Sequence, residues 1–273
     1  MKIKYLGTAA YEGVPSLFCT CDVCKESIKL KGRNLRSRSQ ALINNDLLID
    51  FNADTVWHYI NYNFDWTNIH DCLITHSHCD HLYVDDMEMI RNGYAKCEGY
   101  YLNYYAGKSG YDMINNLLSK DSMQGKGKVT LLEDGKIFQI NDYKIMAIKA
   151  NHDPKSSPFI FAIEQNGKKI LYGNDSGWLC ENSWNHLKKF GPFDLVSLDC
   201  TAGLLKNWRD NHLSFDIDLE IFSKMLEDNI INNKTIKVVN HFSHNGKATY
   251  DTLSKVAKEY GVVVSYDGLE IEI

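Results

Sequence analysis

The sequence has only 4 prolines among 273 residues and no long apolar run. No stretch approaches the length of a membrane helix, and the opening MKIKYLGT alternates Lys with apolar residues over too short a span for the apolar core of a signal peptide. No linker rich in Pro or Gly, no short repeat and no low-complexity tract divides the chain. We therefore expect a cytoplasmic protein that folds as one domain over residues 1–273.

An excess of positive charge is also missing, since 30 Lys and Arg stand against 35 Asp and Glu, for a net charge of −5. Binding to nucleic acid or to an anionic membrane depends on clustered cations that neutralise phosphates. The one basic run contains Lys29, Lys31, Arg33, Arg36 and Arg38. Such a run is more often a solvated face, although beside a phosphate site it would steer anions. Neither nucleic acid nor a membrane is an expected partner.

What is present is the composition of a folded α/β protein, 44% hydrophobic and 12% aromatic. Apolar patterning predicts helices over 54–59, with Asp54 as the capping residue, 217–229 and 248–260. It predicts strands over 2–6, 40–51 (two strands joined by a turn), 71–75, 143–149, 159–164, 169–172, 195–198, 236–239, 262–265 and 269–273. Two β-then-α halves indicate two packed sheets flanked by helices, with chemistry along a sheet edge. Residues 98–134 are expected to form an irregular insertion.

A dense group of potential metal ligands follows the strand predicted at 71–75, namely His76, His78, Asp80 and His81. Three His and one Asp this close would suffer charge crowding and desolvation unless a cation lay among them. Alternate side chains of an extended segment share a face, and a turn into the next helix would bring the last histidine around. Imidazole with carboxylate suits zinc, manganese or iron better than calcium.

The run Thr-His-Ser-His-Cys-Asp-His at 75–81 resembles the signature of the metallo-β-lactamase superfamily of binuclear hydrolases. The resemblance implies a four-layer αββα sandwich and three further ligands. One metal would be held by His76, His78 and His152, the other by Asp80, His81 and His241, with Asp175 bridging the two. Oxygen-reducing members typically carry Glu where this chain has His78, which favours hydrolysis over redox chemistry. Two divalent ions (Zn or Mn) about 3.5–4 Å apart can share a water and lower its pKa toward neutrality.

Three cysteines at Cys19, Cys21 and Cys24 form a second candidate site. In a reducing compartment this spacing indicates metal binding rather than disulfides, the alternative being uncoordinated buried thiols. A closed structural zinc site requires four ligands. His244, three residues beyond His241, is the candidate for the fourth, so that one loop would serve both centres. Four other cysteines are expected to be small buried or incidental residues, namely Cys72, Cys97, Cys180 and Cys200.

The cysteine knuckle, placed after the Leu6-Gly7-Thr8 opening, resembles that of the PhnP-like phosphodiesterases of the superfamily. In that group a further active-site histidine is thought to assist the leaving group or to bind phosphate, and His212 is the matching residue. Its alternative is a capping or surface histidine. Asp199 matches a family segment near the site, and we expect it to play a supporting or structural role.

The resemblance implies a phosphodiesterase for small molecules, in which metal-bound hydroxide attacks phosphorus and Asp80 and His212 are the catalytic residues. A cyclic ribose phosphate is the specific substrate that the family suggests. One alternative is a nuclease like the tRNA 3′-processing members, although no Gly/Pro-rich substrate arm is visible. Another is a binding or carrier protein like the PqqB-type relatives, which share the cysteine knuckle but lack an intact catalytic signature. The sequence leaves the native metal and the oligomeric state open, with a homodimer as the candidate.

Overall fold

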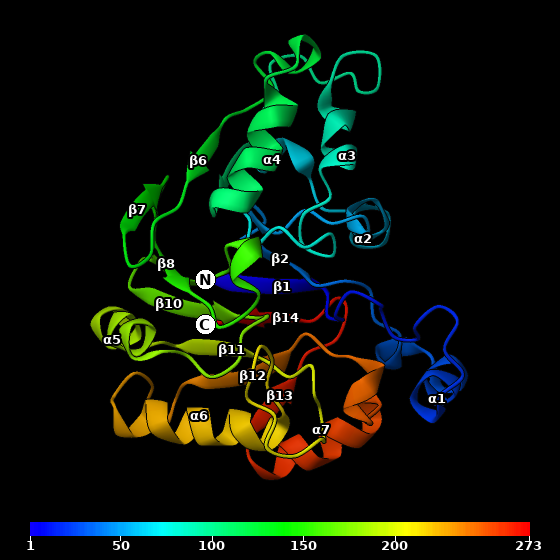
Figure 1. Ribbon diagram of the computed structural model, residues 1–273, viewed down its shortest axis with the longest axis vertical. Coiled ribbons are helices and arrows are strands. Elements are labelled where there is room, and N and C mark those ends of the chain that lie inside the picture. Colours follow the sequence, from blue (N-terminus) through cyan, green and yellow to red (C-terminus); the bar gives the residue numbers. More distant parts are fainter.

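The computed structural model describes residues 1–273 and contains two seven-stranded mixed sheets with helices on both outer faces (Figure 1). The first sheet has the strand order β14 (Glu270–Glu272), β1 (Lys2–Gly7), β2 (Gln40–Ile43), β3 (Leu47–Ile49), β4 (Asp71–Leu73), β5 (Asn103–Ala106) and β6 (Val129–Leu131). The second has the order β13 (Val262–Val264), β12 (Ile236–Asn240), β11 (Leu195–Asp199), β10 (Lys168–Gly173), β9 (Phe159–Gln165), β8 (Tyr143–Lys149) and β7 (Ile137–Ile140).

The helices lie in two outer layers, so the molecule is the predicted αββα sandwich. In Figure 1 the helices α2 (Thr55–Tyr62), α3 (Val84–Met87) and α4 (Lys108–Leu118) lie on the side of the first sheet. On the side of the second sheet lie α5 (Glu181–Phe190), α6 (Phe215–Glu227) and α7 (Tyr250–Glu259). Helix α1 (Asp22–Leu30) projects to one side and follows the cysteine knuckle.

Three apolar clusters hold these layers together. One, which includes Ile3, Tyr5 and Phe161, fills the space between the two sheets. The other two lie under the outer helices, and they include Ile74 with Ile114 on one side and Leu171 with Ile221 on the other. Burial of apolar surface is the main favourable term in folding, so each sheet is covered on both faces. That explains the continuous apolar runs at 159–163 in β9 and 170–172 in β10, which do not alternate with polar residues.

Parallel strand pairs bring the functional loops to one edge. Strands β10, β11, β12 and β13 are parallel neighbours, as are β3, β4, β5 and β6. The carboxyl ends of parallel strands meet at a single edge of a sheet, where their loops can place side chains together. The loops after β4, β10, β11 and β12 therefore come together, although they are far apart in the sequence.

The predicted elements are found with shifted ends, but the expectation of an irregular segment at 98–134 is wrong. That segment contains β5 and β6, which extend the first sheet, and α4, which packs beside them. Helix α4 buries Gly110, Ile114 and Leu117, a spacing of one helical face that its Gly and Asn residues obscure in the sequence. Helices α1 and α5 and strand β7 were also absent from the sequence-based prediction.

Two local expectations differ from the structure because buried polar contacts take precedence. Asp54 precedes α2 but its side chain makes no capping bond; its carboxylate instead accepts from Arg38 N and Nη1, both at 2.9 Å. The basic run is not a solvated face throughout, since Arg36 is buried and donates to Thr8 Oγ1 at 2.7 Å and to the Ser265 carbonyl at 2.8 Å.

The five remaining cysteines differ in exposure. Cys72 and Cys200 are buried, Cys97 is half-buried, and Cys79 and Cys180 are exposed. None of the helices combines the length and the apolar composition that crossing a bilayer requires.

Candidate metal centre

The signature histidines lie on the predicted strand-to-helix loop, between β4 and α3. A tight turn, in which His81 N donates to the His78 carbonyl at 2.9 Å, directs the side chains to one side of the loop. His76 Nε2 and His78 Nδ1 are 3.0 Å apart, and His152 Nε2 lies 3.2 Å from the same His78 atom. His152 follows β8, so the two sheets together supply this first group of three nitrogens.

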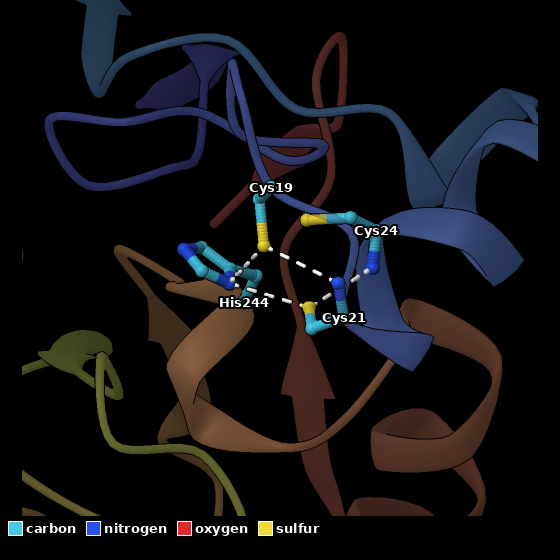
Figure 2. A group of neighbouring side chains, drawn as sticks. All are labelled: Cys19, Cys21, Cys24 and His244. Carbon is cyan, nitrogen blue, oxygen red and sulfur yellow. Dashed lines mark hydrogen bonds between the residues drawn. The ribbon is translucent and has the colours of Figure 1, made fainter.

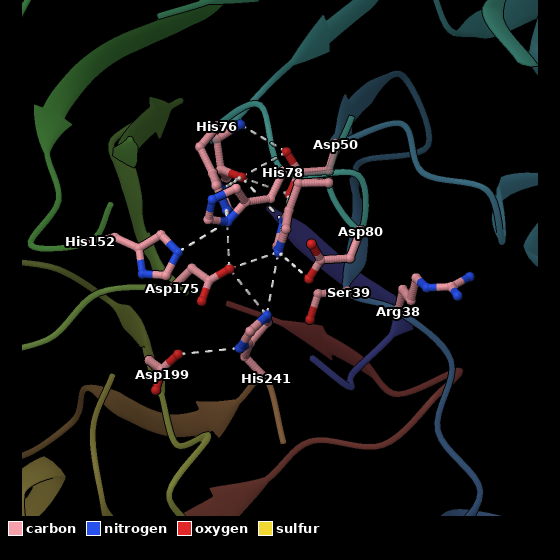
Figure 3. Close-up of polar contacts among 12 residues, drawn as sticks. Arg38, Ser39, Asp50, His76, His78, Asp80, His152, Asp175, Asp199 and His241 are labelled. Carbon is pink, nitrogen blue, oxygen red and sulfur yellow. Dashed lines mark hydrogen bonds and ion pairs between the residues drawn. The ribbon is translucent and has the colours of Figure 1, made fainter. Parts of the chain in front are cut away.

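A second group lies directly beside the first (Figure 3) and contains Asp80, His81, Asp175 and His241. Asp175 Oδ2 is 2.8 Å from His81 Nε2 and 3.3 Å from His241 Nε2. The same oxygen is 3.3 Å from His76 Nε2, so Asp175 lies between the two groups. The structure thus brings together all seven residues that the sequence analysis proposed as active-centre ligands.

Unusual backbone geometry directs three of the acidic and imidazole groups inward. Asp50, Asp175 and His241 have φ angles of 69°, 52° and 63°, in the left-handed region. Asp, Asn and His enter this region more readily than most residues, but each still sits in a sparsely populated conformation that the surroundings must maintain. Asp50 and His241 immediately follow β3 and β12, and Asp175 lies two residues after the end of β10, so a sharp change of direction after each strand turns the side chain toward the centre.

Buried carboxylates fix the orientation of two of the ligand rings. Asp50 Oδ2 accepts from His81 Nδ1 at 2.8 Å, and Thr75 N donates to Asp50 Oδ1 at 2.7 Å. On the opposite side Asp199 Oδ2 lies 3.3 Å from His241 Nδ1. Because a carboxylate only accepts, Asp50 favours a proton on His81 Nδ1. His241 Nδ1 faces Asp199 and also Thr201 Oγ1, which lies 2.8 Å away. Each Nε2 atom therefore points to the centre as the atom that would bind a metal ion.

The charges of the site call for a cation. Burial lowers the pKa of His76 well below its usual value, so that this ring is neutral and free to bind a metal. Burial acts in the same direction on His81, but the surrounding carboxylates, Asp80 first, outweigh it and raise the pKa of His81 well above its usual value. Its nitrogen thus lies in a strongly negative field. The pKa of Asp175 is lowered because the neighbouring histidines outweigh its burial.

These donors fit divalent metal ions. Imidazole nitrogens with ionised carboxylates form the ligand set that zinc, manganese or iron prefers, and the Nε2 atoms of His81 and His241 face each other at 3.3 Å. Two lone pairs at that distance repel unless a proton or a metal ion lies between them. The residues present therefore fit the metal centre that their pattern predicts.

His212 lies at the edge of the second group. Its Nδ1 is 3.1 Å from Asp175 Oδ1 and 3.1 Å from Asp199 Oδ2. Burial would lower the pKa of His212, but Asp199 and Asp175 outweigh it and raise the pKa to about 11. Asp199 itself accepts hydrogen bonds from Thr201 N and Leu213 N, at 3.0 and 2.9 Å. These bonds fix the carboxylate that orients the His212 ring. His212 also lines the site's cavity of about 300 Å³.

The four residues of the cysteine site converge, as the sequence pattern predicts (Figure 2). His244 Nδ1 is 3.4 Å from Cys19 Sγ and 3.4 Å from Cys21 Sγ. Ligand atoms on tetrahedral zinc are separated by about 3.5–3.8 Å when Zn–S is about 2.3 Å and Zn–N about 2.0–2.1 Å. The donors and their spacing therefore fit a closed structural zinc site with Cys24 as the fourth ligand.

Local hydrogen bonds favour a thiolate in this site. Cys21 is the N-cap of α1, and Cys24 N donates to its sulfur at 3.5 Å. Burial opposes ionisation of Cys21, but the hydrogen bonds from Cys24 N and His244 outweigh it and lower the pKa of Cys21 to about 6. Burial raises the pKa of Cys24 to about 12. The thiol of Cys24 therefore needs a bound metal ion in order to ionise at neutral pH.

The sequence analysis missed two residues that contact the ligands. Asp50 closes the apolar strand β3 and is fully buried; a lone acidic residue at the end of an apolar run was the available signal. Glu12 lines the cavity and also lies 3.7 Å from His244 Nε2 through its Oε1 atom. No pattern in the sequence marks Glu12.

An αββα sandwich with adjoining groups of His and Asp ligands at a sheet edge is typical of one class of metal-dependent hydrolases. The family model described as the beta-lactamase superfamily domain matches residues 61–231, and the chain belongs to this superfamily, with the metallo-β-lactamase fold. No curated relative matches the chain by sequence.

Several solved structures share the whole fold. Zn²⁺-bound PqqB from Methylobacterium extorquens has a TM-score of 0.77 and 19% identity, with 100% of each chain covered. A diphosphatase of the PhnP family has a TM-score of 0.74 and 17% identity, covering 100% of this chain and 97% of that one. The short form of human tRNase Z has a TM-score of 0.64 and 17% identity, covering 100% of this chain and 99% of the other. At these identities the likeness establishes the fold alone.

Proposed function

We propose that this protein is a binuclear metal-dependent phosphodiesterase that acts on a small phosphodiester. The observation that carries the proposal is the placement of Asp175 between two complete ligand groups. Its Oδ2 lies 3.3 Å from His76 Nε2 in one group and 2.8 Å from His81 Nε2 in the other. Two adjacent divalent ions supply a lowered pKa for a shared water and stabilise charge on phosphoryl oxygens.

The chain's own residues supply the rest of the reaction. Asp199 and Asp175, each 3.1 Å from Nδ1, outweigh burial and raise the pKa of His212, which lines the cavity. A protonated imidazole in that position can donate to the oxygen of a departing alcohol. Asp80, 3.2 Å from His81 Nε2, completes the second ligand group and keeps its negative charge.

The size of the cavity supports a small substrate. The cavity of about 300 Å³ lies at the lower end of the range for small-molecule sites. The diphosphatase and tRNase Z neighbours share the fold and act on phosphate compounds, as their names state. By family analogy, a cyclic ribose phosphate is a substrate to test.

The test is hydrolysis of bis-p-nitrophenyl phosphate by protein loaded with zinc or manganese, beside cleavage of a precursor tRNA. We expect turnover of the diester, abolished in Asp80→Ala together with loss of active-centre metal. Asp112→Asn, an exposed substitution on α4, serves as the matched control. Cleavage of the tRNA alone would favour the nuclease alternative. Full metal occupancy without turnover of any phosphodiester would favour the carrier alternative represented by PqqB.

A further inference from the structure

The cavity at the metal centre lacks the cations that usually accompany phosphate. It is lined by twelve residues, none of which is Lys or Arg. Phosphate sites in proteins commonly use Arg or Lys to pair with the anion. Any negative charge on a substrate here would therefore be balanced chiefly by the metal ions.

One lining residue adds negative charge at the wall. Glu12 lies on the segment between β1 and α1 and lines the cavity with Tyr11 and Asn245. Its Oε1 accepts a short hydrogen bond from Ser243 Oγ and lies 3.7 Å from His244 Nε2. These contacts hold the carboxylate in place, while its Oε2 atom has no hydrogen bond within the protein.

No cation neutralises this carboxylate. Glu12 has no ion pair with Lys or Arg, its only charged neighbour within 4.0 Å being His244. Arg38 comes close to the cavity wall, since its Nε donates to the Tyr11 carbonyl at 2.9 Å. Its Nη1, however, is paired with Asp54 at 2.9 Å. Glu12 therefore presents an uncompensated negative charge to whatever extends from the scissile phosphate.

We propose that Glu12 makes this cavity select phosphodiesters whose remaining groups carry no negative charge, and reject those that carry a second phosphate. The inference rests on the proposed phosphodiesterase function and names its substrate class as monoanionic diesters. In a cavity of about 300 Å³, a second phosphate that stays inside with the bound phosphodiester lies near the wall that carries Glu12. Like charges near a partly solvated protein surface repel strongly enough to lower binding by about tenfold or more. The free Oε2 instead accepts hydrogen bonds from hydroxyl or amino groups of an accepted substrate.

The test compares two substrates that differ only in the second charge. They are thymidine 5′-(p-nitrophenyl phosphate) and the same compound with a 3′-phosphate, since both release p-nitrophenolate. We expect metal-loaded wild type to prefer the first in kcat/KM, and Glu12→Gln to reduce this preference about tenfold. Glu259→Gln, an exposed change in α7, should leave the preference unchanged. Glutamine retains the size of the side chain and its acceptor for Ser243.

Salt provides a second measurement that needs no variant. Raising ionic strength screens charge repulsion in a solvent-connected cavity, so the preference of wild type should narrow with salt while that of Glu12→Gln changes little. Equal kcat/KM for the two compounds in wild type, or a preference that survives Glu12→Gln unchanged, would overturn this inference alone. If wild type hydrolysed neither compound, the proposed phosphodiesterase function would be overturned. The inference about Glu12 would fall with it.

Discussion

The Nε2 atoms of His81 and His241 lie 3.3 Å apart, although the two residues are 160 positions apart in the sequence. Each ring is held from behind, His81 by Asp50 at 2.8 Å and His241 by Asp199 at 3.3 Å. The signature loop on one sheet and the loop after β12 on the other thus direct ring nitrogens to the same point. Holding ligands in this orientation before the metal ion arrives reduces the conformational cost of binding it.

Replacing Asp50 tests this support. In Asp50→Asn the amide Nδ2 would face His81 Nδ1, which favours the tautomer whose Nε2 carries a proton and cannot bind metal. We expect active-centre affinity for zinc to fall by about 10–100-fold, the usual effect of losing such a partner. Competition with a chromophoric chelator measures the affinity, with Asp112→Asn as the control. An unchanged affinity would show that Asp50 does not orient the ligand.

Replacing one cysteine ligand should remove the metal ion of the cysteine site and leave the active centre loaded. In Cys21→Ser we expect one zinc fewer per chain and a melting temperature lower by about 10 °C or more, because the free energy of metal binding is part of the folding free energy. Metal analysis and thermal unfolding measure both, with the exposed Cys180→Ser as the matched control. Equal zinc content in the two variants would contradict a zinc site at the knuckle.

The proposed role of His212 predicts a dependence on the leaving group. In His212→Asn, kcat/KM for 2′,3′-cyclic AMP should fall by about 100-fold or more, because its ribose alkoxide needs a proton to depart. For bis-p-nitrophenyl phosphate the loss should be below about tenfold, since p-nitrophenolate leaves unprotonated. Steady-state kinetics on both substrates measure this, with His70→Asn as the control. Equal losses on the two would indicate that His212 positions substrate instead.

The buried His58 predicts how stability changes with acidity. Burial lowers its pKa to about 4, while its Nδ1 lies 2.6 Å from Gln40 Oε1. The unfolded chain, with a pKa of about 6.5, binds the proton more readily, so His58 stabilises the fold above that pH and this stability is lost as pH falls toward 4. Between pH 7 and 5 we expect a loss of about 2 kcal/mol from this residue.

Urea unfolding of wild type and His58→Gln at both pH values measures that contribution. Glutamine does not titrate, so the variant should lose less stability on acidification than wild type. His70→Asn is again a suitable control, because this residue contributes no comparable buried imidazole. The same pH dependence in wild type and His58→Gln would assign the acid sensitivity to other groups.

The sequence by itself determined the αββα fold class and proposed both ligand groups, because strands with apolar runs are followed at once by His and Asp. The density of ligands from His76 to His81 needs no tertiary information to be recognised. His152, Asp175, His241 and His244 were reached through the family pattern. Helix α4 was missed because Gly and Asn weaken its apolar periodicity.

Only the tertiary structure decided which groups stand behind the ligands and beside the substrate. Asp50 and Glu12 are single acidic residues with no motif, and their roles arise from contacts across 31 and 231 residues of sequence, to His81 and Ser243. Local propensity and spacing act over a few residues, whereas these contacts depend on how the two sheets pack. That packing fixes the charge around a bound substrate.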